Sequence, residues 1–177
     1  TANNPSQLRG MLEVAGHRAN VIVANPAGIS CDGCGFLNTH RGTLTTGRPI
    51  LNADGSVQGF DIGQGSISVD GLGLYGAGLS QVDLLARALT LNASIWAERV
   101  DAVAGANIVD YNTGAVQAQA GSGPVPSVAI DLAALGGMYA NSIRLVGTEA
   151  GVGVNVGGNL AALTGALEVS ANGDVRF

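Results

Sequence analysis

Lysine is absent from this sequence, and all eight of its basic residues are arginines. Charged residues make up only 12% of the chain and aromatic residues 4%, whereas an average domain has about 25% charged residues. The formal net charge is −5, and no arginine stands next to another. Binding to nucleic acid requires clustered basic side chains that displace counterions from phosphates, so no nucleic-acid partner is expected. An anionic membrane surface is disfavoured for the same reason.

Long apolar runs are also missing. No segment approaches the roughly 18 consecutive apolar residues of a membrane span. Residues 1–5 have neither the basic start nor the apolar stretch of a secretory signal peptide, so in an exported protein we expect that signal to have been removed or to lie upstream. The length of 177 residues suits one domain, which we expect to be a monomer.

Cysteine is limited to one close pair, Cys31 and Cys34. A structural zinc ion needs four ligands, and the two histidines, His17 and His40, lack the spacing of paired ligands, so no metal site is expected. A redox pair usually has its first cysteine at a helix N-terminus, but residues 35–39 indicate a turn and then a strand. The pattern favours a small structural disulfide that closes a loop in an oxidising compartment.

Short runs of alternating aliphatic residues recur along the chain, separated by Gly, Asn, Asp and Ser. Three pairs of apolar residues are 22 positions apart: Ile67 and Leu89, Val69 and Leu91, and Leu145 and Leu167. One coil of a β-solenoid needs such a repeat, because a single coil cannot bury its apolar face without a neighbour. The sequence therefore predicts an all-β solenoid, with an antiparallel sandwich as the alternative.

Two segments interrupt this repeat and are expected to project from the solenoid. Residues 45–65 contain Asp54-Gly55 between two apolar runs, which predicts a hairpin. Residues 109–137 contain a Gly- and Pro-rich stretch and are expected to form a loop or a short extra sheet; within them, residues 127–135 fit either a strand or one helical turn. Residues 157–177 are expected to begin a following repeat region.

Catalytic patterns are weak. Residues 71–76 match the Gly-x-Gly-x-x-Gly dinucleotide motif, but no convincing strand–helix–strand unit follows them, and chance matches are expected in a Gly-rich chain. Paired carboxylates can hydrolyse glycosidic bonds, and sequence alone does not exclude a pair among Asp61, Asp70, Asp83, Asp101 and Asp110. We expect most of these acids to be solvated turn residues, and we predict no catalytic residues and no cofactor.

The segment Asn25-Pro26-Ala27-Gly28 has the residues of a type I turn, which fits a solenoid corner. Residues 18–29, which include this turn and Ile29, resemble the Asn-Pro-Asn-Gly-Ile region of two-partner secretion domains, with Ala27 where many members have Asn. Further similarities follow in order at residues 35–39, 43–47, 95–97, 103–107, 131–140 and 146–154. Nearly the whole chain is therefore similar to filamentous haemagglutinins and contact-dependent growth inhibition exoproteins, several of which carry a similar Cys-x-x-Cys.

The resemblance implies a right-handed parallel β-helix at the N-terminus of a much larger secreted protein. It also implies recognition in the periplasm by an outer-membrane β-barrel transporter of the Omp85 type, through the periplasmic domains of that partner. In this hypothesis Asn25, Pro26, Ala27, Gly28 and Ile29 form the secretion motif. The earlier Asn-Pro-Asn-Leu motif of the family is absent, so the first coils are expected to be missing.

Two other functions remain open from the sequence. The chain could be an adhesin module that binds host glycans, with Tyr75, Trp96, Tyr111 and Tyr139 as the candidate aromatic contacts, although Trp96 lies in a strand-like run that is typical of a core. It could also be a β-helical enzyme acting on glycans, which the absence of a recognisable acid pair disfavours.

Overall fold

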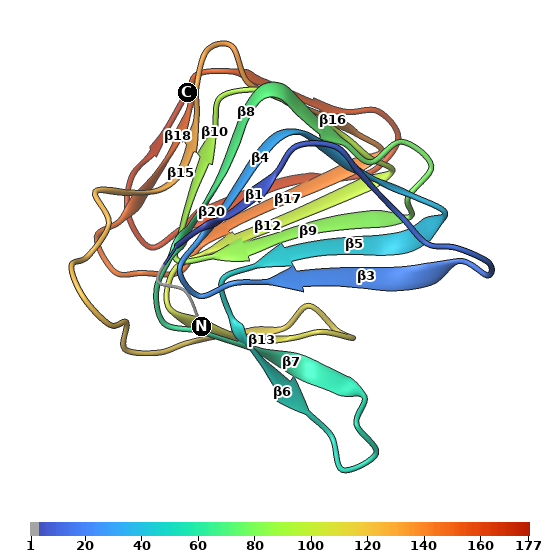
Figure 1. Cartoon of the computed structure of the whole chain (residues 1–177). Helices are drawn as coiled ribbons and strands as arrows, with labels where there is room; N and C mark the ends of the chain where they lie inside the picture. The colour runs from blue at the N-terminus through green and yellow to red at the C-terminus, as the bar shows by residue number, and fades with distance from the viewer. Residues whose placement is uncertain (1–3) are drawn as a thin grey trace.

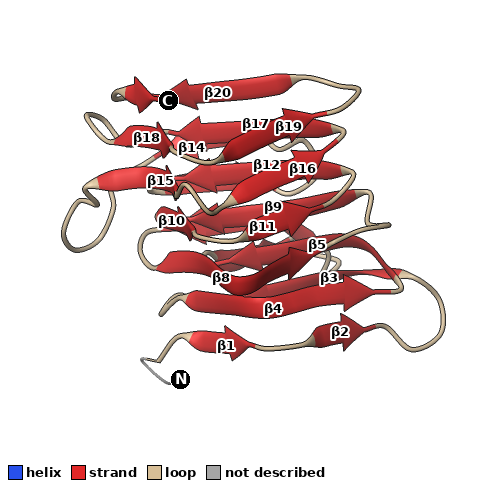
Figure 2. Ribbon diagram, turned by 90° about the horizontal axis from the view of Figure 1, so that it is seen from above, coloured by secondary structure: helices blue, strands red, loops and turns tan. Residues whose placement is uncertain are grey.

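The alternating aliphatic runs form strands that wind as a right-handed parallel β-helix, so the predicted fold class is confirmed. The computed structural model describes residues 4–177. Figure 1 shows the strands of successive coils lying side by side, and Figure 2 shows the coils stacked from β1 (Ser6–Leu8) up to β20 (Leu167–Ala171). No helix in this part of the chain is long and apolar enough to cross a membrane.

Each coil crosses a first parallel sheet, turns a corner and returns through a second parallel sheet. Within residues 4–177 the first sheet contains β1, β2 (Met11–Glu13), β4 (Ile29–Leu37), β8 (Ser66–Tyr75), β10 (Ala88–Leu91), β11 (Ser94–Trp96), β15 (Val128–Leu132), β16 (Gly137–Ala140), β18 (Gly153–Val156), β19 (Asn159–Ala162) and β21 (Val175–Arg176). The second sheet contains β3 (Ala19–Ala24), β5 (Thr39–Thr45), β9 (Gln81–Ala86), β12 (Arg99–Ala104), β17 (Ser142–Gly147) and β20. The coils are numbered here from the first, β1–β3, through the second, β4–β5, the third, β8–β9, and the fourth, β10–β12.

The strand register can be compared with the 22-residue spacing of apolar residues in the sequence. Ile67 pairs with Leu89 and Val69 with Leu91, as the spacing of 22 predicts. The third predicted pair is wrong, because Leu145 pairs with Val169, 24 positions later, and not with Leu167. The corners between strands differ in length from coil to coil, so the spacing of apolar residues is not constant along the chain.

The inside of the β-helix is an almost purely apolar column. Its members include Leu44, Leu84, Ala102 and Leu145, which are register neighbours on the inward side of the second sheet. Every one of them is fully buried. Because an aliphatic side chain contributes about 1.5–3 kcal/mol when fully buried, each added coil stabilises the coil beneath it.

Both segments expected to project from the solenoid join in one antiparallel sheet, named here the outer sheet. It contains β6 (Arg48–Leu51), β7 (Val57–Ile62), β13 (Asn107–Asp110) and β14 (Val116–Ala118), in the order β14-β13-β7-β6. The predicted hairpin is formed by β6 and β7, with Gly55 at φ +84° in its turn. The outer sheet covers a second apolar cluster on the outward side of the second parallel sheet, which includes Phe60, Leu85 and Val103.

The second projecting segment is shorter than the predicted 109–137. β15 pairs with β10 in the first parallel sheet, so the chain has returned to the β-helix by Val128. Residues 127–135 are thus part strand and not a helical turn, because Ile130 and Leu132 alternate into the interior beside Leu89 and Leu91. Residues 157–177 contribute β19, β20 and β21, which continue the same stacking.

Candidate functional site

The corner expected at residues 25–29 is a turn that joins β3 to β4. The Gly28 amide donates a hydrogen bond to the Asn25 carbonyl oxygen at 2.9 Å, which closes the turn. Oδ1 of Asn25 accepts a second hydrogen bond, also 2.9 Å long, from the Ala27 amide. Gly28 has a φ of +122°, a conformation that strains residues with a side chain. Ile29 is buried in the interior cluster, so the turn ends at the first core residue of β4.

Asn25 also ties the turn to the first coil. Its Nδ2 donates to the Asn4 carbonyl oxygen at 3.1 Å and to Oγ of Ser6 at 2.9 Å. The Ser6 amide in turn donates to the Gly28 carbonyl oxygen at 3.0 Å. Toward the third coil, a Cβ added to Gly28 would lie 3.0 Å from the Ser66 carbonyl oxygen. The turn is therefore wedged between two coils, and the Asn25 amide group positions the first strand.

A hollow of about 350 Å³ opens beside this turn, between Pro26 and the loop that follows β14. Gln64 borders it and donates from Nε2 to the Pro26 carbonyl oxygen at 3.3 Å. The opposite wall is formed by Ser122, Gly123, Pro124 and Pro126, nearly a hundred positions away in the sequence. Sequence reasoning missed this neighbourhood, because only the folded outer sheet brings the loop back to the turn.

Cys31 and Cys34 form a disulfide, as the sequence predicts. The prediction that it closes a loop is wrong, since both cysteines lie within β4 and belong to the buried interior cluster. In the next coil they face Val69 and Leu74. Gly33 between them has a φ of +67°, and the register shifts there, so the strand bends and both sulfur atoms face inward.

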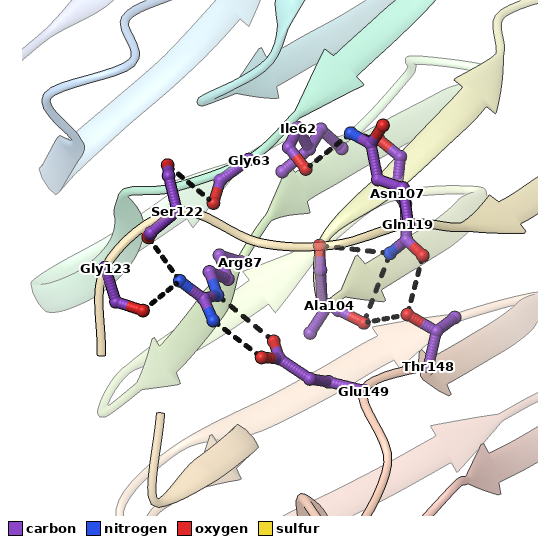
Figure 3. Close-up of polar contacts among 11 residues, drawn as sticks. Ile62, Gly63, Arg87, Ala104, Asn107, Gln119, Ser122, Gly123, Thr148 and Glu149 are labelled. Atoms are coloured by element: carbon purple, nitrogen blue, oxygen red, sulfur yellow. Dashed lines mark hydrogen bonds and ion pairs between the residues drawn. The ribbon is translucent and has the colours of Figure 1, made fainter. Parts of the chain in front are cut away.

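A buried arginine, Arg87, links the loop that follows β14 to Glu149, which follows β17 of the β-helix (Figure 3). Nε and Nη2 of Arg87 donate to the two carboxylate oxygens of Glu149 at 3.1 and 2.6 Å. Nη1 donates to the carbonyl oxygens of Ser122 and Gly123, in the loop that borders the hollow. Hydrogen bonding to the Glu149 carboxylate raises the pKa of Arg87 above its ordinary value, so this side chain remains charged.

Two of the five aspartates considered as a catalytic acid pair lie next to each other. Asp83 and Asp101 are register partners in β9 and β12, and both are buried beneath the outer sheet. Nε of Arg41 lies 2.6 Å from Oδ2 of Asp83, and Nη1 of Arg144 lies 2.9 Å from Oδ1 of Asp101. Burial raises the pKa of Asp101; Arg144 opposes this shift, and the charge of Asp83 adds to it. Each carboxylate thus forms an ion pair with an arginine and is buried away from any substrate.

Comparison with known proteins decides what this β-helix is. The whole chain, residues 1–177, matches the TPS (two-partner secretion) secretion domain family. The chain belongs to this family. The crystal structure of a filamentous hemagglutinin secretion domain superimposes on the TPS domain with a TM-score of 0.83 at 30% sequence identity, covering 99% of this chain and 72% of that one.

Curated relatives of this TPS domain are much longer proteins. A tRNA nuclease CdiA-2 of Burkholderia pseudomallei strain 1026b is 52% identical over 172 residues, which is 97% of this chain and 6% of the relative. A tRNA nuclease CdiA of Escherichia coli strain STEC_O31 is 53% identical over 98% of this chain and 5% of its own length. The chain therefore spans about one-twentieth of these relatives, and the nuclease in their names describes the whole proteins.

Trp96 does not lie in the core of the TPS domain, where its strand-like run led us to expect it. Trp96 is 48% exposed and Tyr75 is 52% exposed, on the outward side of β11 and β8. The Trp96 ring stacks on Tyr139 of the next coil, with ring centroids 4.3 Å apart. Tyr111, by contrast, is buried beneath the outer sheet, where Arg41 lies over its ring. Sequence reasoning failed for Trp96 because alternation identifies a strand but not which of its sides faces inward.

The remaining sequence motifs carry no ligand site in the described residues. The glycine pattern at residues 71–76 lies at the end of β8 and leads into β9, so a strand follows where a nucleotide site requires a helix N-terminus. Between residues 4 and 177, no group of three His, Cys, Asp or Glu side chains is placed to hold a metal ion.

Proposed function

We propose that this TPS domain is the N-terminal secretion signal and folding nucleus of a large exported adhesin or contact-dependent growth inhibition exoprotein. In this proposal the chain passes through the periplasm of a Gram-negative bacterium to the cell surface. A cognate outer-membrane β-barrel transporter of the Omp85 type recognises it through periplasmic domains. The family match over the whole chain carries the proposal, and the small share of each long relative that the chain covers supports it.

The fold supplies a driving force for such export. No ATP is available outside the inner membrane, so outward movement needs another source of free energy. A marginal stability of about 0.05–0.15 kcal/mol per residue gives roughly 9–27 kcal/mol for a domain of this size. Coils that stack outside the cell bury their apolar column and oppose backward movement. Residues 157–177, which continue the stacking, would then be the platform on which the following repeats fold.

The turn at residues 25–29 is the proposed secretion motif. Two of the three hydrogen bonds of the Asn25 side chain hold Asn4 and Ser6, at the start of the first coil, against the turn, and the third lies within the turn, so we expect the turn to control closure of the earliest coil. The Pro26 side of the turn borders the hollow beside the loop of residues 122–126, which leaves part of the motif accessible to a partner. Both properties support a motif that nucleates folding and is also read by the transporter.

Secretion of the domain, with a signal peptide supplied upstream, tests this proposal in cells with and without the cognate transporter. We expect the domain in the medium only when the transporter is present. Asn25→Ala removes all three side-chain hydrogen bonds and should reduce secretion strongly. Asn25→Asp keeps the acceptor for the Ala27 amide but loses the donor to Asn4 and Ser6, so it should give an intermediate loss.

Arg48→Ala is the control, because this side chain is exposed on the outer sheet. Equal secretion of the Asn25 variants and the Arg48 variant would contradict the role of the turn. Retention in the periplasm with and without the transporter would contradict the secretion function itself. Thermal unfolding of each purified variant separates a folding defect from a loss of recognition.

A second candidate is a glycan-binding adhesin module, and the exposed stack of Trp96 and Tyr139 favours it. Sugars bind through their C–H faces to aromatic rings, and a hollow of about 250 Å³ next to this stack is also bordered by Glu98 and Asn141, which could hydrogen-bond hydroxyl groups. Trp96→Ala should abolish binding on a glycan array if this function holds. An array without any signal for the unaltered domain would remove the candidate.

A further inference from the structure

Arg87 follows directly after β9 and is only 5% exposed. In the described residues, all hydrogen-bond acceptors of its guanidinium come from residues later in the sequence. The two carbonyl acceptors, Ser122 and Gly123, lie 35 and 36 positions later, and the carboxylate of Glu149 lies 62 positions later. Figure 3 shows these groups converging on the guanidinium from two separate segments.

The same downstream segment satisfies a second buried group. Asn107, at the start of β13, is fully buried, and its Oδ1 accepts a hydrogen bond from Oγ1 of Thr148 at 2.6 Å (Figure 3). The Thr148 amide also donates to the Ala104 carbonyl oxygen at the end of β12, at 3.0 Å. Thr148 and Glu149 therefore complete polar groups of Arg87 after the third coil, of Ala104 in the fourth coil and of Asn107 at the start of the outer sheet.

The backbone of β9 does not depend on the downstream segment, although β12 of the fourth coil pairs with β17 just before Thr148. β9 pairs only with β5 and β12 in the described residues, and both lie before residue 107. The Arg87 amide donates to the Gly65 carbonyl oxygen, and the Gly105 amide to that of Ala86. Until Thr148 and Glu149 are present, the Arg87 guanidinium lacks its counterion and Oδ1 of Asn107 lacks its donor, whereas Nδ2 of Asn107 already donates to the Ala104 and Gly105 carbonyl oxygens. A buried guanidinium without a counterion is far more costly than a paired one.

We propose that Thr148 and Glu149 act as a latch on folding: the coils around β9 reach their final packing only after the chain through Glu149 is available. The inference rests on the proposed secretion function, in which the coils stack outside the cell. A latch far downstream would keep the early coils from closing in the periplasm, and it would commit the domain to fold in one step after about 150 residues have emerged.

Refolding of the full-length domain, followed by pulsed hydrogen exchange and mass spectrometry, tests the latch without any transporter. In the unaltered domain, amide protection in β9 should appear together with that in β17. Arg87→Met combined with Glu149→Leu removes the buried charge and its partner, so β9 should become protected clearly before β17. Protection of β9 well ahead of β17 in the unaltered domain would overturn the latch, as would an unchanged order in the double variant.

Glu149→Gln keeps the shape of the side chain but leaves the guanidinium without its counterion. We expect native-state protection of β9 amides to fall about a hundredfold. The matched control is Glu168→Gln, whose carboxylate is exposed and lies 4.0 Å from Nε of Arg144; it should leave β9 unchanged. Equal protection in the two variants would count against the latch.

Secretion assays then link the latch to export. The double variant, which closes its early coils sooner, should be secreted several-fold less than the unaltered domain when the transporter is present. Changed refolding order with unchanged secretion would overturn the export part of the inference. Secretion of the unaltered domain without the transporter would instead overturn the proposed function and leave the refolding result intact.

Discussion

The two sides of the second parallel sheet solve the same packing problem in different ways. Inward, Leu84 and its register neighbours form a column of aliphatic side chains that repeats from coil to coil. Outward, on the same strands, the outer sheet covers apolar residues such as Leu85 together with the buried charges of Asp83 and Asp101. The inner side is repetitive and apolar, whereas the outer side is built from contacts that occur once.

The inner side allows the β-helix to grow along its axis, whereas the outer side defines a single structure for this domain. An aliphatic column accepts another coil wherever side chains of similar size recur, so a β-helix can grow along its axis. The outer contacts cannot be repeated, because each charge needs its own partner: Asp83 needs Arg41, and Asp101 needs Arg144. We infer that the outer side gives this domain one defined structure, while the inner side supplies most of its stability.

Adjacent leucines allow a matched test of this comparison, and here we expect the largest effect. Leu84 is 0% exposed and faces the inner column; Leu85 is 2% exposed and faces the outer sheet. Leu84→Ala should lower the free energy of unfolding by about 3–5 kcal/mol, because stacked coils on both sides cannot close the cavity. Leu85→Ala should cost about 2–3 kcal/mol, because the outer sheet can settle toward the gap. Equilibrium denaturation in urea measures both.

Leu135 provides the control for these two variants, since it is 89% exposed in the corner between β15 and β16. Leu135→Ala should change the free energy of unfolding by less than about 0.5 kcal/mol. Equal losses for Leu84→Ala and Leu85→Ala would show that the two sides are packed equally tightly, and the comparison would then fail.

The strands of the inner side could be predicted from the sequence, because the alternation of apolar residues that marks them lies within a few neighbouring positions. Alternating apolar residues identify strands such as β8, β10 and β17 without reference to distant parts of the chain. The corner at Asn25–Gly28 was also predictable, since Asn, Pro and Gly each have a fixed role within four residues. The register of later coils was predicted less well, because corners of variable length shift the repeat without changing the alternation.

The outer side could not be predicted, because its contacts join residues far apart in sequence. The pairing of β13 with β7 unites two segments that appeared independent, and Arg87 binds Glu149 across 62 positions. Nothing local marks Arg87 as buried, since arginine is almost never fully buried unless it is paired, and its partner here is 62 positions away. The disulfide was predicted correctly as a pair but placed wrongly, because its spacing does not reveal that a bend in β4 turns both sulfur atoms inward.

Reduction of the Cys31–Cys34 disulfide is the next prediction, with an intermediate effect. The closed loop is short, with a sequence separation of 3, so the chain-entropy model gives a loss of about 2 kcal/mol. Because both cysteines lie in the inner column, the loss should lower the stability of the β-helix as a whole and not that of the outer sheet alone. Urea denaturation with and without reductant, followed by exchange protection in β4 and β7, measures this. Loss of protection confined to β7 would contradict the prediction.

The smallest expected effect is a difference in pH dependence between a covered acid and the acids at the tips of the outer sheet. Burial raises the pKa of Asp101, whereas hydrogen bonds from Ser56 lower the pKa of Asp54 and those from Thr113 lower the pKa of Asp110. The folded state holds the proton of Asp101 more tightly than the unfolded state does. The stability that Asp101 contributes is therefore fully present below its unfolded pKa and is lost as the pH rises through its folded pKa.

For Asp54 and Asp110 the sign is opposite: their contribution is present above the unfolded pKa and is lost as the pH falls through the folded pKa. The stability of the unaltered domain relative to Asp101→Asn should therefore decrease as the pH rises from about 3 to 7, and relative to Asp54→Asn it should increase. Unfolding midpoints in urea across this range measure both differences. A constant difference between the unaltered domain and Asp101→Asn would mean that Arg144 fully offsets the burial of Asp101, and the outer side would then resemble the inner side in carrying no electrostatic penalty.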